Sequence, residues 1–396
     1  MSTLVTGPRE LRGRTAIAGA ATWGSGESPG FTDMELLARA ARAAVEDAGL
    51  KMSDIDGLCT ANLMSSMWPL NVAEYLKLRP RFTEGTNIGG SAFVAHLLPA
   101  ALALSAGVCN AVLVCYGSAA RTGPGSRAAR YNAWELIDPH PYEAAYEPFN
   151  PPSAYALIAA RHMHQYGTTR RQLAEVAVAA RGWARLNPEA FMRDPLTIEE
   201  VLASRMVSDP FTVRDCCLVT DGGAAFVMVR ADRAKQLRKK PVYLLGSATA
   251  VWHRQISGMD DLTVTPSKQS GEHAFAMAGL SPKDMHMLST YDAFTMNTIL
   301  ALEDLGFCRK GEGGAFVQDG AIAPGGRFPV NTNGGGLSCT HPGMYGAFAV
   351  IEAVRQLRGE AGERQLKNAQ TAVVNGNGGD SACSQSTAVL GTDATL

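Results

Sequence analysis

Apolar and polar positions alternate along the chain in a way that predicts strands and helices in turn. Residues 15–22 have the pattern of a strand, the segment that opens at Thr32 has one apolar and one charged face, and 55–62 is again strand-like. Glu35 stands three residues after Thr32, which is the spacing of a helix capping box. Such alternation is typical of an α/β fold, and we expect a mostly parallel sheet.

One segment is apolar on every face. Residues 91–106 therefore predict a central helix that is covered on both sides, followed by a buried strand at 111–117. The segment has about 16 residues and contains His96 and Pro99, whereas a membrane span needs about 20 apolar residues. We expect a buried helix and no contact with a membrane.

The character of the chain changes between about residues 118 and 220. Loops rich in proline and aromatic residues come first, and amphipathic helices follow. We interpret this region as an insertion of loops and helices that lies over the sheet. The strand-like run 222–230 closes the first half, and we place the boundary near residue 235, which gives halves 1–235 and 236–396.

The second half repeats the pattern of the first. The first half contains Ala48-Gly49-Leu50, then Asp54-Ile55 after three residues, then Leu58 after two more. The second half contains Ala278-Gly279-Leu280, Asp284-Met285 and Leu288 at the same spacing. The offset is constant, and the buried helix and strand that follow also have counterparts, in the helix after His341 and the strand at 372–378. A duplication at this spacing implies two similar halves related by a pseudo-twofold axis.

Composition narrows the class of protein. Hydrophobic residues make up 46% and charged residues 18%, which is typical of a compact globular protein. Lys and Arg total 36 against 37 Asp and Glu, so nothing in the overall charge favours nucleic acid as a partner. The eight cysteines form no CxxC pair and the N-terminus has no apolar signal segment, so we expect a reduced cytoplasmic protein without a bound metal.

Three segments carry candidate chemistry. We expect helices to begin at Gly90 and at Pro342, with His341 as the cap of the second helix and Tyr345 one turn further on the same face. Helix N-termini favour negative charge, and in a pseudo-symmetric pair they can converge on one site. Tyr291 and Asp292 follow the predicted strand 285–290, at the carboxyl end where ligands bind in such sheets.

Residues 166–190 and 194–229 resemble the sterol-carrier-protein-type branch of the thiolases, and the order of elements fits the thiolase fold over nearly the whole chain. The resemblance implies two pseudo-symmetric halves in a layered α-β-α-β-α architecture. It also implies a nucleophilic cysteine at the start of the first buried helix and, usually, a second cysteine in a Gly-rich C-terminal loop.

This chain departs from the thiolase pattern at those positions. Gly90 stands where the nucleophile belongs, the second cysteine position falls near Asn375, and Tyr291 replaces the Asn or His ahead of Asp-Ala-Phe. His341 is kept, with Tyr345 added. Loss of the thiol removes the group that holds the acyl chain in a two-step acyl transfer, so we expect a reaction without an acyl-enzyme.

The tyrosine-bearing loops resemble the thiolase-fold subunit of bacterial aldolases that remove steroid side chains. That resemblance implies retro-aldol cleavage of a 17-hydroxy steroid side-chain CoA ester, a β-hydroxyacyl-CoA, to a 17-ketosteroid and propionyl-CoA. It further implies a complex with a small OB-fold protein that carries a zinc ribbon, with zinc in that partner and no cofactor in this chain. The thiolase fold also implies a homodimer.

We assign roles on this basis. Tyr345 is the expected general base or proton shuttle, because a helix N-terminus and a cationic His341 would lower its pKa. Tyr291 is the expected acid or hydroxyl-orienting group, and His341 donates to the thioester or enolate oxygen. The expected substrate-binding residues are Asp292, Gly90, Ser91, Asn331, Gly335 and Asn375.

Two alternatives remain open from the sequence. One is a noncanonical thiolase or acyltransferase that uses Cys339 as a relocated nucleophile. The other is an inactive acyl-CoA or lipid-binding scaffold, in which the two tyrosines are ordinary packing residues.

Overall fold

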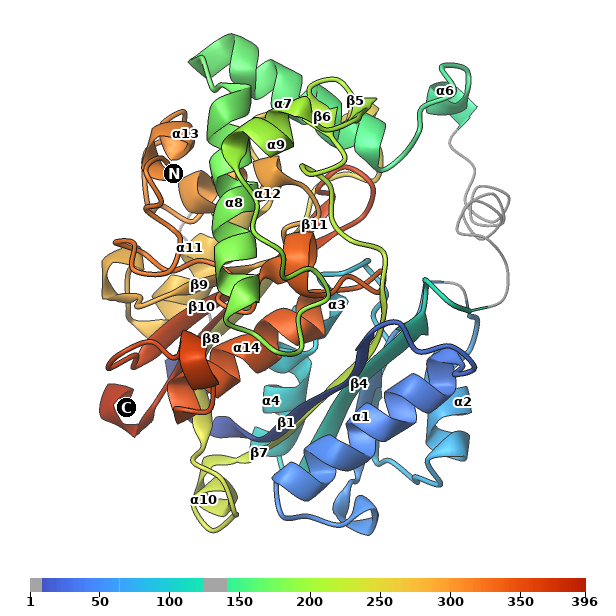
Figure 1. Cartoon of the computed structure of the whole chain (residues 1–396). Helices are drawn as coiled ribbons and strands as arrows, with labels where there is room; N and C mark the ends of the chain where they lie inside the picture. The colour runs from blue at the N-terminus through green and yellow to red at the C-terminus, as the bar shows by residue number, and fades with distance from the viewer. Residues whose placement is uncertain (1–8, 64, 124–140) are drawn as a thin grey trace.

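Nine strands form one mixed sheet in the computed structural model, which describes residues 9–63, 65–123 and 141–396 (Figure 1). Their order is β3-β2-β4-β7-β1-β8-β11-β10-β9. The strands are β1 (Thr15–Gly26), β2 (Gly57–Thr60), β3 (Phe82–Glu84), β4 (Ala111–Ala119), β7 (Asp221–Arg230), β8 (Val242–Val251), β9 (Leu288–Thr290), β10 (Thr371–Gly378) and β11 (Ser384–Gly391). The two halves meet at β1 and β8, where Ala16 pairs with Tyr243 and Ile17 pairs with Val242.

Helices lie outside and between the two halves of the sheet. α1 packs on the outer face of β1, β4 and β7, and α11 packs in the same way on β8 and β11. α4 and α14 contact strands of both halves, α3 contacts β8, β10 and β11 of the second half, and these three helices form the layer between the halves. The bounds are α1 (Asp33–Asp47), α2 (Trp68–Tyr75), α3 (Ala92–Ala95), α4 (Leu97–Ser105), α11 (Ser267–Ala278), α12 (Thr295–Asp304), α13 (Gly313–Phe316) and α14 (Gly346–Arg358). This is the expected α-β-α-β-α arrangement.

The long connection between β4 and β7 forms the expected insertion of loops and helices. Its described part has helices α6 (Pro141–Ala144), α7 (Pro152–Tyr166), α8 (Arg170–Arg185) and α9 (Ile198–Ala203), and a small hairpin of β5 (Met206–Ser208) and β6 (Phe211–Thr212). In Figure 1, α7, α9, β5 and β6 stand together at the top of the molecule, α8 runs from them toward its middle, and α6 lies apart on the right. α8 contacts the loop of residues 335–339, so the insertion reaches the second half.

The strand order shows the duplication directly. The order β2-β4-β7-β1 in the first half is matched by β9-β10-β11-β8 in the second. The expectation of a mostly parallel sheet is wrong, because only the pairs of β2 with β3, β2 with β4 and β9 with β10 are parallel. β7 returns from the long insertion and β11 follows β10 through a short loop, so both run against their neighbours.

Helix starts depend on local backbone geometry, and two of them differ from expectation. The capping box at Thr32 is present, since its side chain accepts from the Glu35 N–H at 3.2 Å and the Glu35 carboxylate accepts from the Thr32 N–H at 2.9 Å. The helix expected from Gly90 begins instead at Ala92, and it is interrupted at His96 between α3 and α4. Pro99, three residues later, has no N–H to continue the ladder.

The helix predicted from Pro342 begins instead at Gly346, with Tyr345 as its N-cap. Gly343 has φ +102°, a left-handed conformation that cannot be part of a right-handed helix. His341 and Tyr345 therefore do not share a helical face, and the expectation that His341 caps this helix is wrong.

The residues that the structure describes contain no helix with both the length and the apolar character needed to cross a membrane. Residues 1–8, which are part of the segment in which we expected no secretion signal, lie outside the described residues.

Candidate active site

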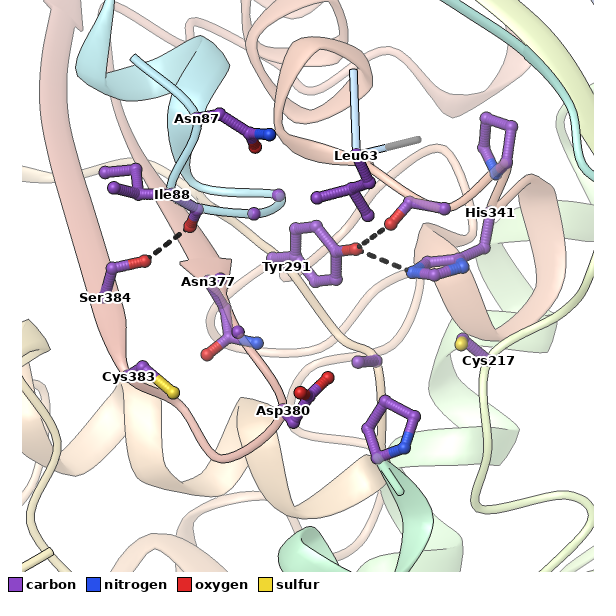
Figure 2. Close-up of a pocket in the computed structure, with 18 of the residues that line it drawn as sticks. Leu63, Asn87, Ile88, Cys217, Tyr291, His341, Asn377, Asp380, Cys383 and Ser384 are labelled. Atoms are coloured by element: carbon purple, nitrogen blue, oxygen red, sulfur yellow. Dashed lines mark hydrogen bonds between the residues drawn. The ribbon is translucent and has the colours of Figure 1, made fainter. Parts of the chain in front are cut away.

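A cavity of about 680 Å³ opens between the two halves of the molecule. Strand ends and loops of both halves form its wall. The first half contributes Asn62, Leu63, Asn87, Ile88, Gly90 and Tyr116, and the second contributes Tyr291, His341, Gly343, Asn377, Asp380, Cys383 and Ser384 among others. Figure 2 shows several of these side chains around one tyrosine ring.

Tyr291 and His341 meet at this wall. The Tyr291 hydroxyl lies 2.8 Å from His341 Nε2 and 2.9 Å from the carbonyl oxygen of Gly343, to which it can donate (Figure 2). The two rings are edge to face, with centroids 5.3 Å apart. The sequence had placed His341 beside Tyr345, but in the structure the hydroxyl that contacts its imidazole is that of Tyr291, and both residues line the cavity.

Backbone contacts fix both residues. Tyr291 follows β9, and its N–H donates to the carbonyl of Asn375 on β10 at 2.9 Å. His341 lies in the loop before α14, and its N–H donates to the Thr220 hydroxyl at 2.9 Å. The end of β9 holds the phenol, and the loop before α14, which is bonded to Thr220 just before β7, holds the imidazole. The two side chains are thereby kept in contact.

The phenol of Tyr291 is neutral in this setting. Burial raises its pKa well above the ordinary value, and the nearby Cys217 and Tyr116 act in the same direction. A free phenolate is therefore disfavoured. The hydroxyl can accept a proton only if it passes its own proton on at the same time, and His341 Nε2 lies at the distance needed for that transfer.

Tyr345 is not on the cavity wall. Its side chain is completely buried, and its hydroxyl is paired with the amide of Asn333, 2.9 Å from Nδ2 and 3.0 Å from Oδ1. Its ring packs edge-on against Tyr291 at 5.7 Å. The expected lowering of its pKa is wrong, because burial, and after it the nearby Asp292, raise the pKa well above the ordinary value.

Asp292 and Gly335 shape the loop behind His341. Asp292 Oδ1 accepts from the Gly336 N–H at 2.6 Å, and burial raises the pKa of this carboxyl to about 7. Gly335 has φ +63°, and a Cβ there would lie 2.0 Å from Asp292 Oδ2. Neither residue lines the cavity, so they support the loop and do not contact a ligand in it.

Ser91, Asn331 and Asn375 are also absent from the cavity wall. Ser91 Oγ lies 2.7 Å from the Ser384 hydroxyl, and Asn331 Oδ1 accepts from the backbone of Thr290 at 2.7 Å. Asn375 is bonded to buried hydroxyls of neighbouring elements. Of the six expected substrate-binding residues, only Gly90 lies on the wall.

Cys339 cannot serve as a relocated nucleophile in this cavity. It lies in a separate cavity of about 10 Å³, and burial, with Glu189 and Glu352 nearby, raises the pKa of its thiol. Sequence reasoning overlooked Cys217 and Cys383, which do line the main cavity. Burial raises the pKa of Cys383, whose thiol donates to the Arg254 carbonyl at 3.0 Å.

Tyr155 on α7 is a second residue that sequence reasoning missed. Its buried hydroxyl accepts from Asn377 Nδ2 at 2.7 Å and from the Ala382 N–H at 2.9 Å, and its ring stacks on Phe294. It therefore ties the insertion to the loop that forms one side of the cavity. The Gly-rich run 376–379 marks that loop in the sequence, but nothing there points to Tyr155.

Within the described ranges, His, Cys, Asp and Glu side chains form no group of three or more that could hold a metal ion.

Comparison with known proteins agrees with this architecture. Residues 248–392 match the family model described as thiolase C-terminal domain-like. The chain is 33% identical to an acetyl-CoA acetyltransferase of Methanothermobacter thermautotrophicus, over 92% of this chain and 96% of that protein. It is also 33% identical to the 17-hydroxy-3-oxo-4-pregnene-20-carboxyl-CoA lyase of Mycobacterium tuberculosis, over 88% and 92%.

A solved structure titled "Ltp2-ChsH2(DUF35) aldolase" superposes with a TM-score of 0.85 at 32% identity, covering 97% of this chain and 99% of that one. Relatives named for acyl transfer and relatives named for lyase activity are thus both similar to this chain. The similarity alone does not decide between the two activities, whereas the residues of the cavity differ in the chemistry they allow. Together, the duplicated halves, the matched family model and these relatives show that the chain belongs to the thiolase family.

Proposed function

We propose that the protein is a carbon-carbon lyase that cleaves a bulky β-hydroxyacyl-CoA by a retro-aldol reaction. The observation that carries this proposal is the Tyr291–His341 hydrogen bond of 2.8 Å at the cavity wall, on which position 90 is a glycine and supplies no thiol. A phenol and an imidazole in contact can move protons, and retro-aldol cleavage needs only proton transfer and stabilisation of an enolate.

The first step removes the proton from the substrate hydroxyl. Tyr291 accepts it while its own proton crosses 2.8 Å to His341 Nε2, so no free phenolate forms. The hydroxyl oxygen becomes a ketone oxygen, the Cα–Cβ bond breaks, and its electron pair forms the thioester enolate.

The second step returns the proton. The imidazolium gives up its proton, through Tyr291, to the α-carbon of the enolate, and both groups regain their starting state. One proton leaves the substrate oxygen and one arrives at carbon, so no external acid, oxidant or covalent intermediate is needed. Positioned acid–base groups of this kind contribute about 10²–10⁴-fold to a rate.

The apolar part of the cavity wall supports a bulky substrate. Leu63, Val219, Val251, Trp252 and Phe294 all line the cavity, whose volume of about 680 Å³ is large enough for a ring system. With the lyase relative above, this supports a 17-hydroxy steroid side-chain CoA ester as the substrate, with a 17-ketosteroid and propionyl-CoA as products.

The proposal extends to the assembly. We propose that the chain forms a homodimer and binds a small OB-fold protein with a zinc ribbon, in the reduced environment of the cytoplasm. The solved Ltp2-ChsH2(DUF35) aldolase carries two components in its name, which supports a heteromeric complex. Co-expression with such a partner, followed by measurement of the mass of the purified complex, tests this part separately.

Product analysis tests the reaction itself. The protein is incubated with a tertiary β-hydroxyacyl-CoA that carries a steroid ring, and ketone and CoA esters are quantified by mass spectrometry. We expect ketone and shortened acyl-CoA in equal amounts, without consumption of free CoA. A matched incubation with a 3-ketoacyl-CoA and free CoA should give no thiolysis, and thiolysis without ketone release would overturn the proposal.

A further inference from the structure

We infer that a side chain at position 90 and a tyrosine at position 291 cannot be present together. This pair of positions therefore determines whether the cavity performs lyase or acyl-transfer chemistry. The inference rests on the proposed function for the identity of the reaction, but its steric part stands on geometry alone. It makes Gly90 a specificity-determining residue, although it has no side chain to contribute.

The steric conflict is severe. A Cβ at Gly90 would lie 2.0 Å from Cε2 and 2.6 Å from Cζ of Tyr291, and 2.8 Å from the carbonyl oxygen of Asn377. Real Cβ atoms are essentially never found within 3.0 Å of another heavy atom. The phenol ring therefore fills the volume that any side chain at position 90 would need.

Tyr291 cannot swing away without losing its contacts. Its side chain is 5% exposed, its N–H is bonded to Asn375, and its hydroxyl is held by His341 and Gly343. The ring also packs edge-on against Tyr345. A shift that relieved the clash would break the hydrogen bond on which the proposed reaction depends.

The backbone at Gly90 is equally confined. A Cβ on Gly346 would lie 2.3 Å from the Gly90 carbonyl oxygen, and a Cβ on Gly89, where φ is +73°, would lie 2.6 Å from the Gly379 N. The backbone of 89–90 thus lies directly against two other segments, at Gly346 and at Gly379, and both approaches depend on glycine.

A smaller residue at 291 would reverse the situation. The two closest contacts, with the ring, would be gone, and the volume of the ring would become available to a side chain at position 90. The Asn377 carbonyl oxygen, 2.8 Å from that Cβ, would still have to move by a few tenths of an ångström. In a Gly90→Cys/Tyr291→Asn variant, the sulfur can attack the thioester carbonyl. A sulfur–carbon bond forms, the bond to the CoA sulfur breaks, and the thiol proton leaves with CoA as free CoA.

A stability cycle tests the steric part. Melting temperatures are measured for the wild type, Gly90→Ala, Tyr291→Ala and the double variant. We expect Gly90→Ala to lower the melting temperature by more than about 5 °C with Tyr291 present and by clearly less with alanine there. As a matched control, Gly182→Ala, whose Cβ would approach nothing closer than 3.2 Å, should shift both backgrounds equally. An equal effect of Gly90→Ala in both backgrounds would overturn the inference.

Intact mass after incubation with acyl-CoA tests the chemical part. We expect an acyl adduct on Gly90→Cys/Tyr291→Asn, with release of free CoA, and no adduct at this position on Gly90→Cys or Tyr291→Asn alone. An adduct at this position on Gly90→Cys with Tyr291 intact would overturn the inference, and so would its absence from a folded double variant. Failure of ketone release by the wild type would refute the proposed function but leave the stability cycle as it stands.

Discussion

The two halves of the molecule have the same arrangement of strands and helices but contribute different side chains to the cavity. At the constant offset of the duplication, Ala61 and Asn62 after β2 correspond to Tyr291 and Asp292 after β9. The first half gives the cavity amides, apolar side chains, the bare backbone of Gly90 and the phenol of Tyr116, whereas the hydrogen-bonded pair of Tyr291 and His341 lies entirely in the second half. Both halves therefore shape the space, and one of them alone provides the proposed proton-transfer pair.

Two tyrosines of the second half sharpen this contrast. Tyr291 faces the cavity and contacts His341, while Tyr345 lies behind it with its hydroxyl bonded to Asn333. Their ring centroids are only 5.7 Å apart. Their roles therefore differ because of where each hydroxyl lies and what it is bonded to, although the two rings are neighbours.

Removal of the cavity-facing hydroxyl should have the largest effect. We expect Tyr291→Phe to lower kcat for ketone release by about 10³-fold, since it cuts the path between substrate and His341. The measurement is steady-state kinetics, with binding of a non-cleavable CoA ester as a check that the cavity is intact.

Tyr345→Phe is the matched variant, because it removes the same atom from the neighbouring ring. We expect less than about a tenfold loss of kcat, since that hydroxyl does not reach the cavity. If Tyr345→Phe abolished turnover while Tyr291→Phe retained it, the base would be Tyr345, as the sequence alone had indicated.

His341→Gln should follow in size. Glutamine can still hydrogen-bond to the phenol but cannot accept its proton as imidazole does, so we expect kcat to fall by about 10²-fold with little change in KM. Steady-state kinetics across pH check this, and unchanged turnover would contradict a relay between the two residues.

Tyr155→Phe tests the tie between the insertion and the cavity loop. It leaves Asn377 Nδ2 and the Ala382 N–H without their buried acceptor, so we expect a loss of about 1–3 kcal/mol in the free energy of unfolding. Denaturant unfolding measures this. Tyr142→Phe, at a side chain that is 66% exposed, is the control and should have no measurable effect.

Asp292→Asn should have the smallest effect, visible as a change in pH dependence. The pKa of this carboxyl is raised to about 7 in the folded state, so its protonated form stabilises the fold at low pH. That contribution is lost as pH rises from about 4 to 7. Asparagine keeps the acceptor for Gly336 but does not titrate. Melting temperatures over this range should therefore decline less in the variant, and parallel profiles would contradict the assignment.

Sequence patterns predicted the arrangement of helices and strands well, because capping, hydrophobic periodicity and the repeated motif can each be recognised within short stretches of sequence. The repeat from Ala48 onward, the buried segment at 91–106 and the insertion between about 118 and 220 all correspond to observed elements. Strand direction was predicted wrongly, as mostly parallel, because it depends on where the chain re-enters the sheet after the insertion.

The site was predicted only in part, for a physical reason. Tyr291 could be placed from a strand end. Gly90 and His341 also line the cavity, although the helices expected to begin at Gly90 and Pro342 begin at Ala92 and Gly346. The position of Tyr345 depended on a helix start that Gly343 moves by its left-handed backbone. Whether Ser91, Asn331 or Asn375 faces a cavity depends on packing between distant segments, which periodicity does not report.

The central claim is that protons move between Tyr291, His341 and substrate without a bond from the chain to the acyl group. The most direct measurement is intact-mass analysis of the protein quenched during turnover of the β-hydroxyacyl-CoA, with ketone quantified in the same samples. We predict ketone release at the steady-state rate while the protein keeps its unmodified mass. An acyl adduct that forms and decays at the rate of turnover, on Cys217, Cys383 or any other residue, would contradict the account.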